Sequence, residues 1–149
     1  GRKMEKSLSF LEKIKETFAC EEIDVKTYSP LALAFMGDCI FEIIIRTVVV
    51  ERGNRGANGL HKTKSAVVNA KVPAVMAEAL LPELTEEELA CYKRGRNAKS
   101  HTMAKNASVG EYRKATGLEA LYGYLYLQDK EDRLLELTKL GLERVNISI

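Results

Sequence analysis

The sequence predicts a single all-α domain, and three observations lead to that fold class. Apolar residues recur at helical spacing, as Leu8, Leu11, Ile14 and Phe18 do near the N-terminus. No segment shows the alternation of apolar and polar residues that marks a half-buried strand. The length of 149 residues suits one domain with one core, and a composition of 46% apolar and 30% charged residues is that of a globular protein.

The first three helical segments follow from their start and stop signals. The N-terminal helix ends before a break over residues 21–29. Ser29 and Pro30 form a typical N-cap and first-turn pair, so a long helix should run from there to about Glu51. A third helical stretch is expected from about Leu60 to Leu80, with Pro73 as a kink or break.

The remaining helices are predicted in the same way. Thr85 and Glu88 form a capping box that opens a fourth helix, which should fade within KRGRNAKS, residues 93–100. After a loop to about Gly110, a fifth helix is expected to about Gln128. A last helix should run from about Asp129 to Arg144 and contribute to the core through Leu134, Leu137 and either Leu140 or Leu142.

The charges are distributed unevenly, although the net charge is only +2. Residues 52–77 and 89–110 contain ten of the 23 basic residues and none of the 21 acidic ones. Such asymmetry favours a basic surface for a polyanion, and nucleic acid is the polyanion we expect. The alternative is a solvated basic face without a partner.

Cysteine content and hydropathy bear on the compartment. The three cysteines are odd in number and form no CxxC pair, which predicts reduced thiols in a cytoplasmic protein. The longest apolar run contains Asp38, Glu42 and Arg46, so no membrane span is expected.

That same run poses a question, because it places a carboxylate in a helix that is apolar nearly all round and should be buried. Asp38, Glu42 and Arg46 are four residues apart and share one stripe of the helix. A buried carboxylate is costly without a cation or strong donors. Glu42 precedes Arg46 in the favourable order for an ion pair, so a structural role for Glu42 stays open beside a role near a metal.

A second carboxylate, Glu119, lies in a similar setting on the fifth predicted helix. Small residues surround it at helical spacing, and they would let a neighbouring helix approach closely: Ala115, Thr116, Ala120 and Gly123. Two carboxylates on closely packed helices suit Mg²⁺, which prefers oxygen ligands and keeps most of its waters. The alternative is a pair of unrelated structural ion pairs.

Two motifs give these carboxylates a common context. The segment LAFMGDCIFE, residues 33–42, resembles the signature of the ribonuclease III family, and TGLEALYGYLYL, residues 116–127, resembles its second motif. Together with RGRNAKS, residues 94–100, these segments resemble the Mini-ribonuclease III branch, which lacks a double-stranded-RNA-binding domain.

The resemblance also suggests a division of the chain. It covers residues 24–145, which we interpret as the catalytic domain. Residues 1–23 would be an N-terminal extension with a helix, and residues 1–3, which precede Met4, a vector-derived remnant. Residues 146–149 would be a tail.

The resemblance implies a fold, an activity and partners. It implies an all-α ribonuclease III-type domain in a homodimeric helical bundle. Asp38 and Glu119 match the catalytic, metal-binding positions, with Mg²⁺ as cofactor and Mn²⁺ as a substitute. The implied function is an endoribonuclease that cuts double-stranded RNA, leaving 5′-phosphate and 3′-hydroxyl ends, in the maturation of large-subunit (23S) precursor ribosomal RNA in the cytoplasm.

The sequence also departs from the family pattern. Three positions where other family members carry acids are occupied here by Leu31, Ala34 and Thr116. The two acids that remain in the motifs, Asp38 and Glu119, support a site for at least one metal ion. Glu42 and Thr116 are candidates for residues just outside the metal ligands. The missing acids support an alternative, a non-catalytic RNA-binding or ribosome-associated protein on the same fold.

Without an RNA-binding domain, the basic windows must provide the RNA contacts. Contacts to phosphates and the shallow minor groove are expected on duplex RNA. We expect Gly95 to let the backbone approach a phosphate. The candidate side chains are Arg52, Arg55, Lys62, Lys64, Lys93, Arg94, Arg96 and Lys99.

Overall fold

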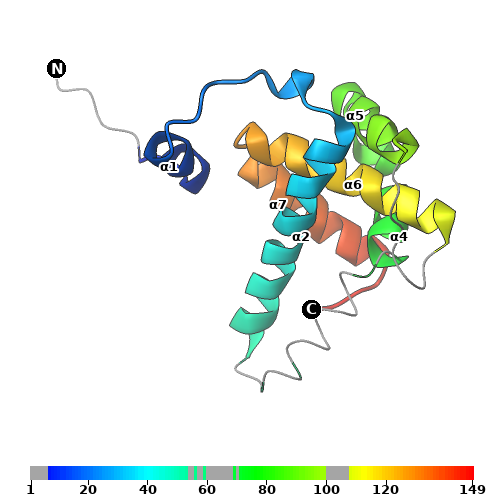
Figure 1. Cartoon of the computed structure of the whole chain (residues 1–149). Helices are drawn as coiled ribbons and strands as arrows, with labels where there is room; N and C mark the ends of the chain where they lie inside the picture. The colour runs from blue at the N-terminus through cyan, green and yellow to red at the C-terminus, as the bar shows by residue number, and fades with distance from the viewer. Residues whose placement is uncertain (1–6, 54–55, 57–58, 60–68, 70, 100–107) are drawn as a thin grey trace.

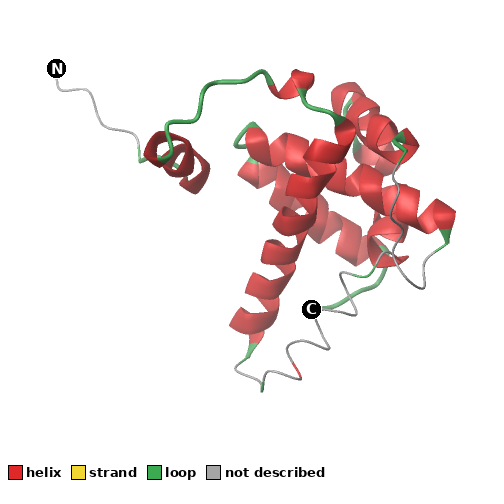
Figure 2. Cartoon of the chain, in the orientation of Figure 1, coloured by secondary structure: helices red, strands yellow, loops and turns green. Residues whose placement is uncertain are grey.

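The computed structural model describes residues 7–53, 56, 59, 69, 71–99 and 108–149. Within these ranges every regular element is a helix and none is a strand (Figure 2). The predicted all-α fold class is therefore confirmed. The longer helices are α1 (Phe10–Thr17), α2 (Pro30–Arg52), α4 (Lys71–Leu80), α5 (Glu86–Asn97), α6 (Val109–Leu127) and α7 (Glu131–Arg144), with short 3-10 turns η1 (Val25–Thr27) and η2 (Leu81–Glu83).

Helix α2 begins where the sequence predicts. The Ser29 hydroxyl accepts a hydrogen bond from the backbone N–H of Ala32 at 3.1 Å, and Pro30 occupies the first turn. An N-cap side chain satisfies one of the backbone donors that a helix start leaves unpaired, which fixes the start of the helix. The predicted range of 30–51 is confirmed to within one residue.

Helix α5 opens with the predicted capping box between Thr85 and Glu88. Helix α6 begins at Val109, two residues earlier than expected, because Ser108 and Glu111 form a capping box of the same kind. The Ser-x-x-Glu pattern that marks this start is present in the sequence and was the available signal.

Pro73 does not kink a longer helix among the described residues. It is the third residue of α4, within the first turn. Backbone N–H groups in the first turn have no partner inside the helix, so proline costs no hydrogen bond there. Asn69 was expected to be helical but is a bend, and its side-chain oxygen accepts a hydrogen bond from the backbone N–H of Lys71 at 3.0 Å. Residues 60–68 and 70, which were also expected to be helical, lie outside the described part of the chain.

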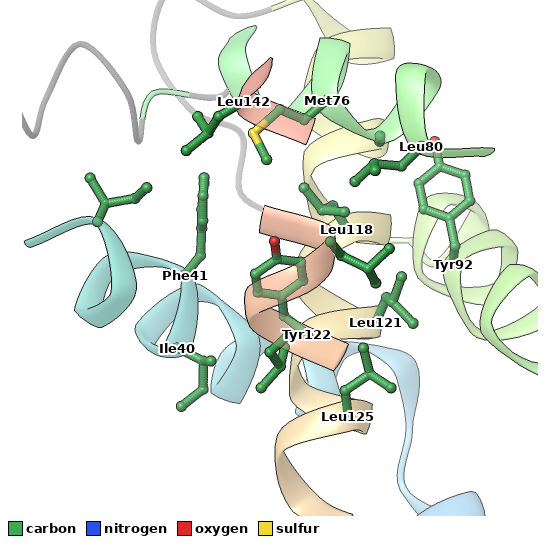
Figure 3. Close-up of a cluster of buried hydrophobic side chains, with 14 of the residues drawn as sticks. Ile40, Phe41, Met76, Leu80, Tyr92, Leu118, Leu121, Tyr122, Leu125 and Leu142 are labelled. Atoms are coloured by element: carbon green, nitrogen blue, oxygen red, sulfur yellow. The ribbon is translucent and has the colours of Figure 1, made fainter. Parts of the chain in front are cut away.

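Helix α6 is the centre of the molecule and is surrounded by α2, α4, α5 and α7 (Figure 1). Several of its buried side chains meet those of the surrounding helices in a large hydrophobic cluster (Figure 3), and Ala120 and Tyr124 belong to a second, smaller cluster with residues of α2 and α5. Tyr122 is fully buried, and its hydroxyl is hydrogen-bonded to that of Thr138 on α7. Leu134, Leu137 and Leu142 of α7 are buried in this region, as predicted, and Leu140 is half-buried.

Helix α2 differs from its predicted burial. One face packs on α6, and the opposite face is exposed, with Phe35 84% and Ile43 54% accessible. Within one chain, no other described helix covers that face. The expectation that α2 is buried all round is therefore wrong for the single chain, and Asp38 is exposed.

Helix α1 lies to one side of the other helices, at the end of an extended connection (Figure 1). Among the helices that the structure describes, none combines the length and the hydropathy required to cross a bilayer.

Candidate active site at the crossing of helices α2 and α6

Two glycines let α2 and α6 touch through their backbones. A Cβ atom at position 37 would lie 1.6 Å from the carbonyl oxygen of Glu119, and one at position 123 would lie 2.0 Å from the carbonyl oxygen of Leu33. Neither distance is possible for a real side chain. Gly37 and Gly123 are therefore required for this crossing, as the small residues around Glu119 predicted.

The crossing brings the two predicted carboxylates together. Asp38 follows Gly37 directly on α2, and Gly37 rests on the backbone of Glu119 itself. Asp38 is exposed and Glu119 is half-buried, so the pair lies at the surface edge of the crossing. The prediction of two buried carboxylates is thus corrected for Asp38, because the helix stripe that carries it borders the solvent.

The electrostatics of Glu119 reflect this neighbourhood. Burial raises the pKa of Glu119 to about 9, and the negative charge of Asp38 and a hydrogen bond with it add to the increase. Two carboxyl groups this close cannot both ionise cheaply unless a cation lies between them. A divalent cation would reverse the repulsion, and oxygen donors of this kind suit Mg²⁺.

The pair consists of two carboxylates only. Among the described residues, no group of three or more histidine, cysteine, aspartate or glutamate side chains is arranged to hold a metal ion. Magnesium is commonly held by one or two carboxylates and water, so the pair fits this ion.

Glu42 forms the ion pair that its spacing predicts. The Nε atom of Arg46 donates to Oε1 of Glu42 at 2.8 Å, and the Nη2 atom of Arg46 donates to the same oxygen. Both residues line a shallow surface groove together with Asp38. Glu42 is therefore close to Asp38 along α2 and is bound to a cation of the chain.

The three positions where family acids are replaced have different surroundings. Ala34 and Thr116 are buried, and Leu31 is exposed at 39%. The Thr116 hydroxyl donates to the carbonyl oxygen of Tyr112 at 2.9 Å, one turn earlier on α6. This hydroxyl thus hydrogen-bonds within its own helix, and a place for Thr116 just outside the metal ligands stays a prediction.

The basic residues of α5 are partly engaged in the fold. Arg94 donates through Nη2 to the carbonyl oxygen of Tyr28 at 3.3 Å. The Arg96 guanidinium lies 5.8 Å from the centre of the Tyr92 ring and donates to Asn97. Lys93 and Lys99 are exposed. All four lie on or directly after the second half of α5.

Gly95 has a different role from the predicted one. It is buried, and a Cβ atom there would lie 2.6 Å from Cβ of Ala120 and 3.0 Å from Cα of Gly117. The glycine therefore lets α5 pack against α6, and the expectation that it exposes backbone to a phosphate is wrong. The sequence alone shows only that Gly95 lies between the basic residues Arg94 and Arg96, which does not reveal its packing on α6.

The first basic window is described only in part. Arg52 is exposed and donates from Nε to the carbonyl oxygen of Ile149 at 3.1 Å. The predicted RNA contacts Arg55, Lys62 and Lys64 lie outside the described residues and remain predictions.

Comparison with known proteins identifies the family of the chain. The Ribonuclease III domain family matches residues 31–130, which include both carboxylates and the whole α2–α6 crossing. The chain is 49% identical over 124 residues to the Mini-ribonuclease 3 of Enterococcus faecalis, covering 82% of this chain and 94% of that protein. It is 42% identical to the Mini-ribonuclease 3 of a Thermoanaerobacter species, covering 94% of this chain and 97% of that one.

A solved structure shows the same fold. A crystal structure of a Fusobacterium nucleatum protein superimposes with a TM-score of 0.74 at 34% sequence identity, covering 82% of this chain and 98% of that one. The family match spans more than half of the chain, and the relatives are matched over most of their length. The chain therefore belongs to the ribonuclease III family, with Mini-ribonuclease 3 proteins as its relatives, and it is an endoribonuclease.

Proposed function

We propose that the chain cleaves double-stranded RNA in a metal-dependent reaction at the α2–α6 crossing, with Asp38 and Glu119 as the catalytic, metal-binding residues. The observation that carries the proposal is the backbone contact of Gly37 with Glu119, which places the two carboxylates side by side. The direct interaction of two carboxylates is unfavourable in a purely structural site. It is useful in a site that takes up a divalent cation.

Asp38 and Glu119 would hold Mg²⁺, with Mn²⁺ as a substitute. When bound, the ion supplies an activated water and offsets the charge that develops on the scissile phosphate. The chain contributes the position of the carboxylates, fixed by two backbone contacts between helices, and the partial burial of Glu119, which strengthens its electrostatic interactions. Hydrolysis would leave 5′-phosphate and 3′-hydroxyl ends.

We also infer that the protein acts as a homodimer. The outer face of α2 exposes Phe35, Ile43 and Val50 at 84%, 54% and 54%. It continues into an apolar groove that Ile43 shares with Leu135 of α7 and Phe10 of α1. Contiguous exposed apolar surface of this kind marks an association site. Phe35 and Ile43 also line the groove containing Asp38. A second copy that covers this face would therefore form one wall of that groove and complete an RNA-binding surface.

The substrate we propose is duplex precursor ribosomal RNA of the large subunit, 23S, processed in the cytoplasm. The basic residues on and directly after α5 support a polyanionic duplex, since Lys93 and Lys99 are exposed and available to phosphates. The Mini-ribonuclease 3 relatives support a ribonuclease, and the ribosomal substrate is what the resemblance of the motifs implies.

The test is cleavage of a defined RNA duplex with Mg²⁺ and with EDTA by wild type, Asp38→Asn and Glu119→Gln. We expect cleavage only with the metal and a decrease of about 10³-fold or more in both variants, because a metal ion contributes several kcal/mol to such reactions. Asp132→Asn, an exposed carboxylate on α7, is the matched control and should cleave like wild type. Undiminished cleavage by Asp38→Asn or Glu119→Gln would contradict the site.

A further inference from the structure

We propose that Arg46 is an RNA-binding residue of the α2 groove that takes a phosphate of the bound duplex next to the cleavage site, and that Glu42 positions its guanidinium. This inference rests on the proposed function and adds a residue that the basic windows of the sequence do not contain. It concerns the groove lined by Phe35, Met36, Asp38, Cys39, Glu42, Ile43 and Arg46.

The first step is the charge of this groove. Its lining contains two carboxylates, Asp38 and Glu42, and Arg46 is its basic residue. A groove that presents only acids would repel the phosphates that flank a cleavage site, even where one of those acids binds a metal. Arg46 is therefore the group of this groove that can attract the RNA backbone.

The second step is position along the helix. Arg46 follows Asp38 by two helical turns, and helical side chains lean toward the N-terminus of their helix. Its guanidinium accordingly lies beside Glu42, which is one turn, or about 6 Å along the axis, from Asp38. A group at that separation would face the RNA backbone next to the phosphate held at the metal site of Asp38 and Glu119.

The third step is the hydrogen-bonding capacity that remains. Arg46 donates hydrogen bonds from Nε and Nη2 to a single oxygen of Glu42. A guanidinium has five N–H donors in a planar fork that matches a phosphate, so donors remain for a phosphate oxygen. The Arg46 side chain is 59% exposed, and the Glu42 side chain is 30% exposed, which leaves the open edge of the fork to the solvent.

The fourth step is the role of the ion pair between Glu42 and Arg46. An exposed ion pair between residues four apart contributes little to stability, so stability alone does not explain it. A carboxylate that holds one edge of the guanidinium reduces the number of side-chain conformations that RNA binding must fix. Glu42 is therefore a positioning residue that acts through Arg46.

The experiment uses the full chain and a defined RNA duplex. Binding is measured in EDTA at several salt concentrations, and single-turnover cleavage is measured in Mg²⁺ at several protein concentrations. The variants are Arg46→Ala, Arg46→Lys and, as the matched control, Lys139→Ala, which removes one exposed positive charge from α7. Circular dichroism verifies that each variant is folded.

We expect Arg46→Ala to weaken binding about tenfold near 0.1 M salt and to reduce the slope of log affinity against log salt by about one, as for the loss of one phosphate contact. The protein concentration at half-maximal cleavage should rise by the same factor, with the maximal rate changed less. Arg46→Lys should restore part of the affinity, and Lys139→Ala should match wild type.

A cycle of variants tests the role of Glu42. Glu42→Gln should weaken binding in the wild-type background and have no further effect once Arg46 is alanine. An equal effect of Glu42→Gln in both backgrounds would contradict the positioning role.

Two further results distinguish a failure of this inference from a failure of the proposed function. Normal binding, salt slope and cleavage by folded Arg46→Ala would overturn the inference and leave the proposed function intact, and so would an equal loss in Lys139→Ala, which would indicate net charge only. Failure of the wild type to cleave with Mg²⁺ would instead overturn the proposed function.

Discussion

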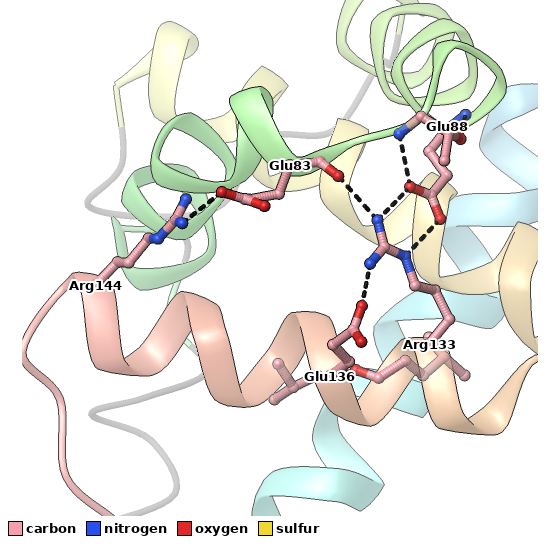
Figure 4. A network of polar contacts seen from close by, with 8 residues as sticks. Glu83, Glu88, Arg133, Glu136 and Arg144 are labelled. Atoms are coloured by element: carbon pink, nitrogen blue, oxygen red, sulfur yellow. Dashed lines mark hydrogen bonds and ion pairs between the residues drawn. The ribbon is translucent and has the colours of Figure 1, made fainter.

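Two glutamates on neighbouring helices, Glu88 and Glu119, show how the same side chain serves stability in one place and chemistry in another. Glu88 of α5 is 6% exposed and receives hydrogen bonds from Nε and Nη2 of Arg133 at 2.9 and 2.8 Å (Figure 4). Glu119 of α6 faces Asp38. One carboxylate is buried with a cation of the chain, and the other is placed against a second carboxylate.

The two pKa shifts are opposite in sign. The hydrogen bond from Arg133 is the largest cause that lowers the pKa of Glu88, and it outweighs the burial of this carboxylate. Burial raises the pKa of Glu119 to about 9, and Asp38 strengthens that increase. Glu88, which serves the stability of the fold, has a cationic partner in Arg133. A carboxyl group whose pKa is raised beside a second carboxyl group indicates a site that binds a ligand from outside the chain.

The largest effect is expected where the crossing itself is altered. Gly123→Ala would push a Cβ against the carbonyl oxygen of Leu33, which is backbone and cannot give way locally. We expect a loss of about 3 kcal/mol in unfolding free energy, the upper range for overpacking, measured by urea denaturation. RNA cleavage should fall as well, because Asp38 and Glu119 move apart with their helices.

The control for this change lies in the same helix. Among the described residues, a Cβ at Gly110 would meet only the Ser108 hydroxyl oxygen, at 3.9 Å. Gly110→Ala should therefore be neutral or stabilise α6 by up to about 1 kcal/mol. Equal losses in both variants would show that the close approach of α2 is not the cause.

Removal of the cation beside Glu88 should give a slightly smaller effect. Arg133→Met leaves a buried carboxylate without its main partner, and Arg133 also binds Glu136 and the carbonyl oxygen of Glu83. Breaking a buried pair costs about 3–5 kcal/mol, and we expect about 2–3 here because the Arg133 side chain is 25% exposed. Thermal and urea unfolding provide the measurement.

The exposed ion pair of Arg144 with Glu83 is the comparison for this variant. Arg144→Met should cost no more than about 1 kcal/mol, as for other surface pairs. Adding Glu88→Gln to Arg133→Met should recover part of the lost stability, since the uncompensated charge is then removed. No recovery would mean that Arg133 acts mainly through its other contacts.

The pH dependence of stability should separate the two glutamates. The pKa of Glu119 rises from 4.5 to about 9 on folding, so without metal the stability falls as the pH rises from about 4.5 to about 9. Each pH unit in this window lowers the free energy of unfolding by at most about 1.4 kcal/mol. Glu119→Gln should flatten this decline in urea titrations performed in EDTA.

Glu88 should behave in the opposite way. Its lowered pKa gives stability that is present above the unfolded value of 4.5 and is lost as the pH falls through the folded value. Glu88→Gln should therefore reduce the loss of stability in acid and leave the alkaline decline unchanged. An alkaline decline that persists in Glu119→Gln would contradict the assignment of that decline.

The smallest effect is expected from the metal itself. At a Mg²⁺ concentration of ten times Kd, binding to the folded state adds about 1.4 kcal/mol. The Tm of wild type should rise accordingly near pH 8, relative to KCl of equal ionic strength, and the Tm of Asp38→Asn should not. A rise of equal size in Asp38→Asn would indicate binding elsewhere.

The helix caps and Gly95 show which features could be predicted from the sequence and which could not. Ser29, Pro30 and the Thr85–Glu88 box fixed two helix starts, because caps act on neighbours along the chain. The capping box of Ser108 and Glu111 marks the start of α6 at Val109 in the same way. Gly95 was misread, since its sequence neighbours are basic and its spatial neighbours are on α6.

By itself, the sequence determined most of the described helices, the favourable spacing of Glu42 and Arg46, and the two motifs that carry Asp38 and Glu119. These depend on contacts within a few residues or on residue identity. Tertiary structure decided which face of α2 is exposed, that Gly37 rests on Glu119, and that Arg46 shares a groove with Asp38. The physical reason is that burial, pKa and groove shape depend on the angle at which helices cross, and that angle is set by contacts between residues far apart in the chain.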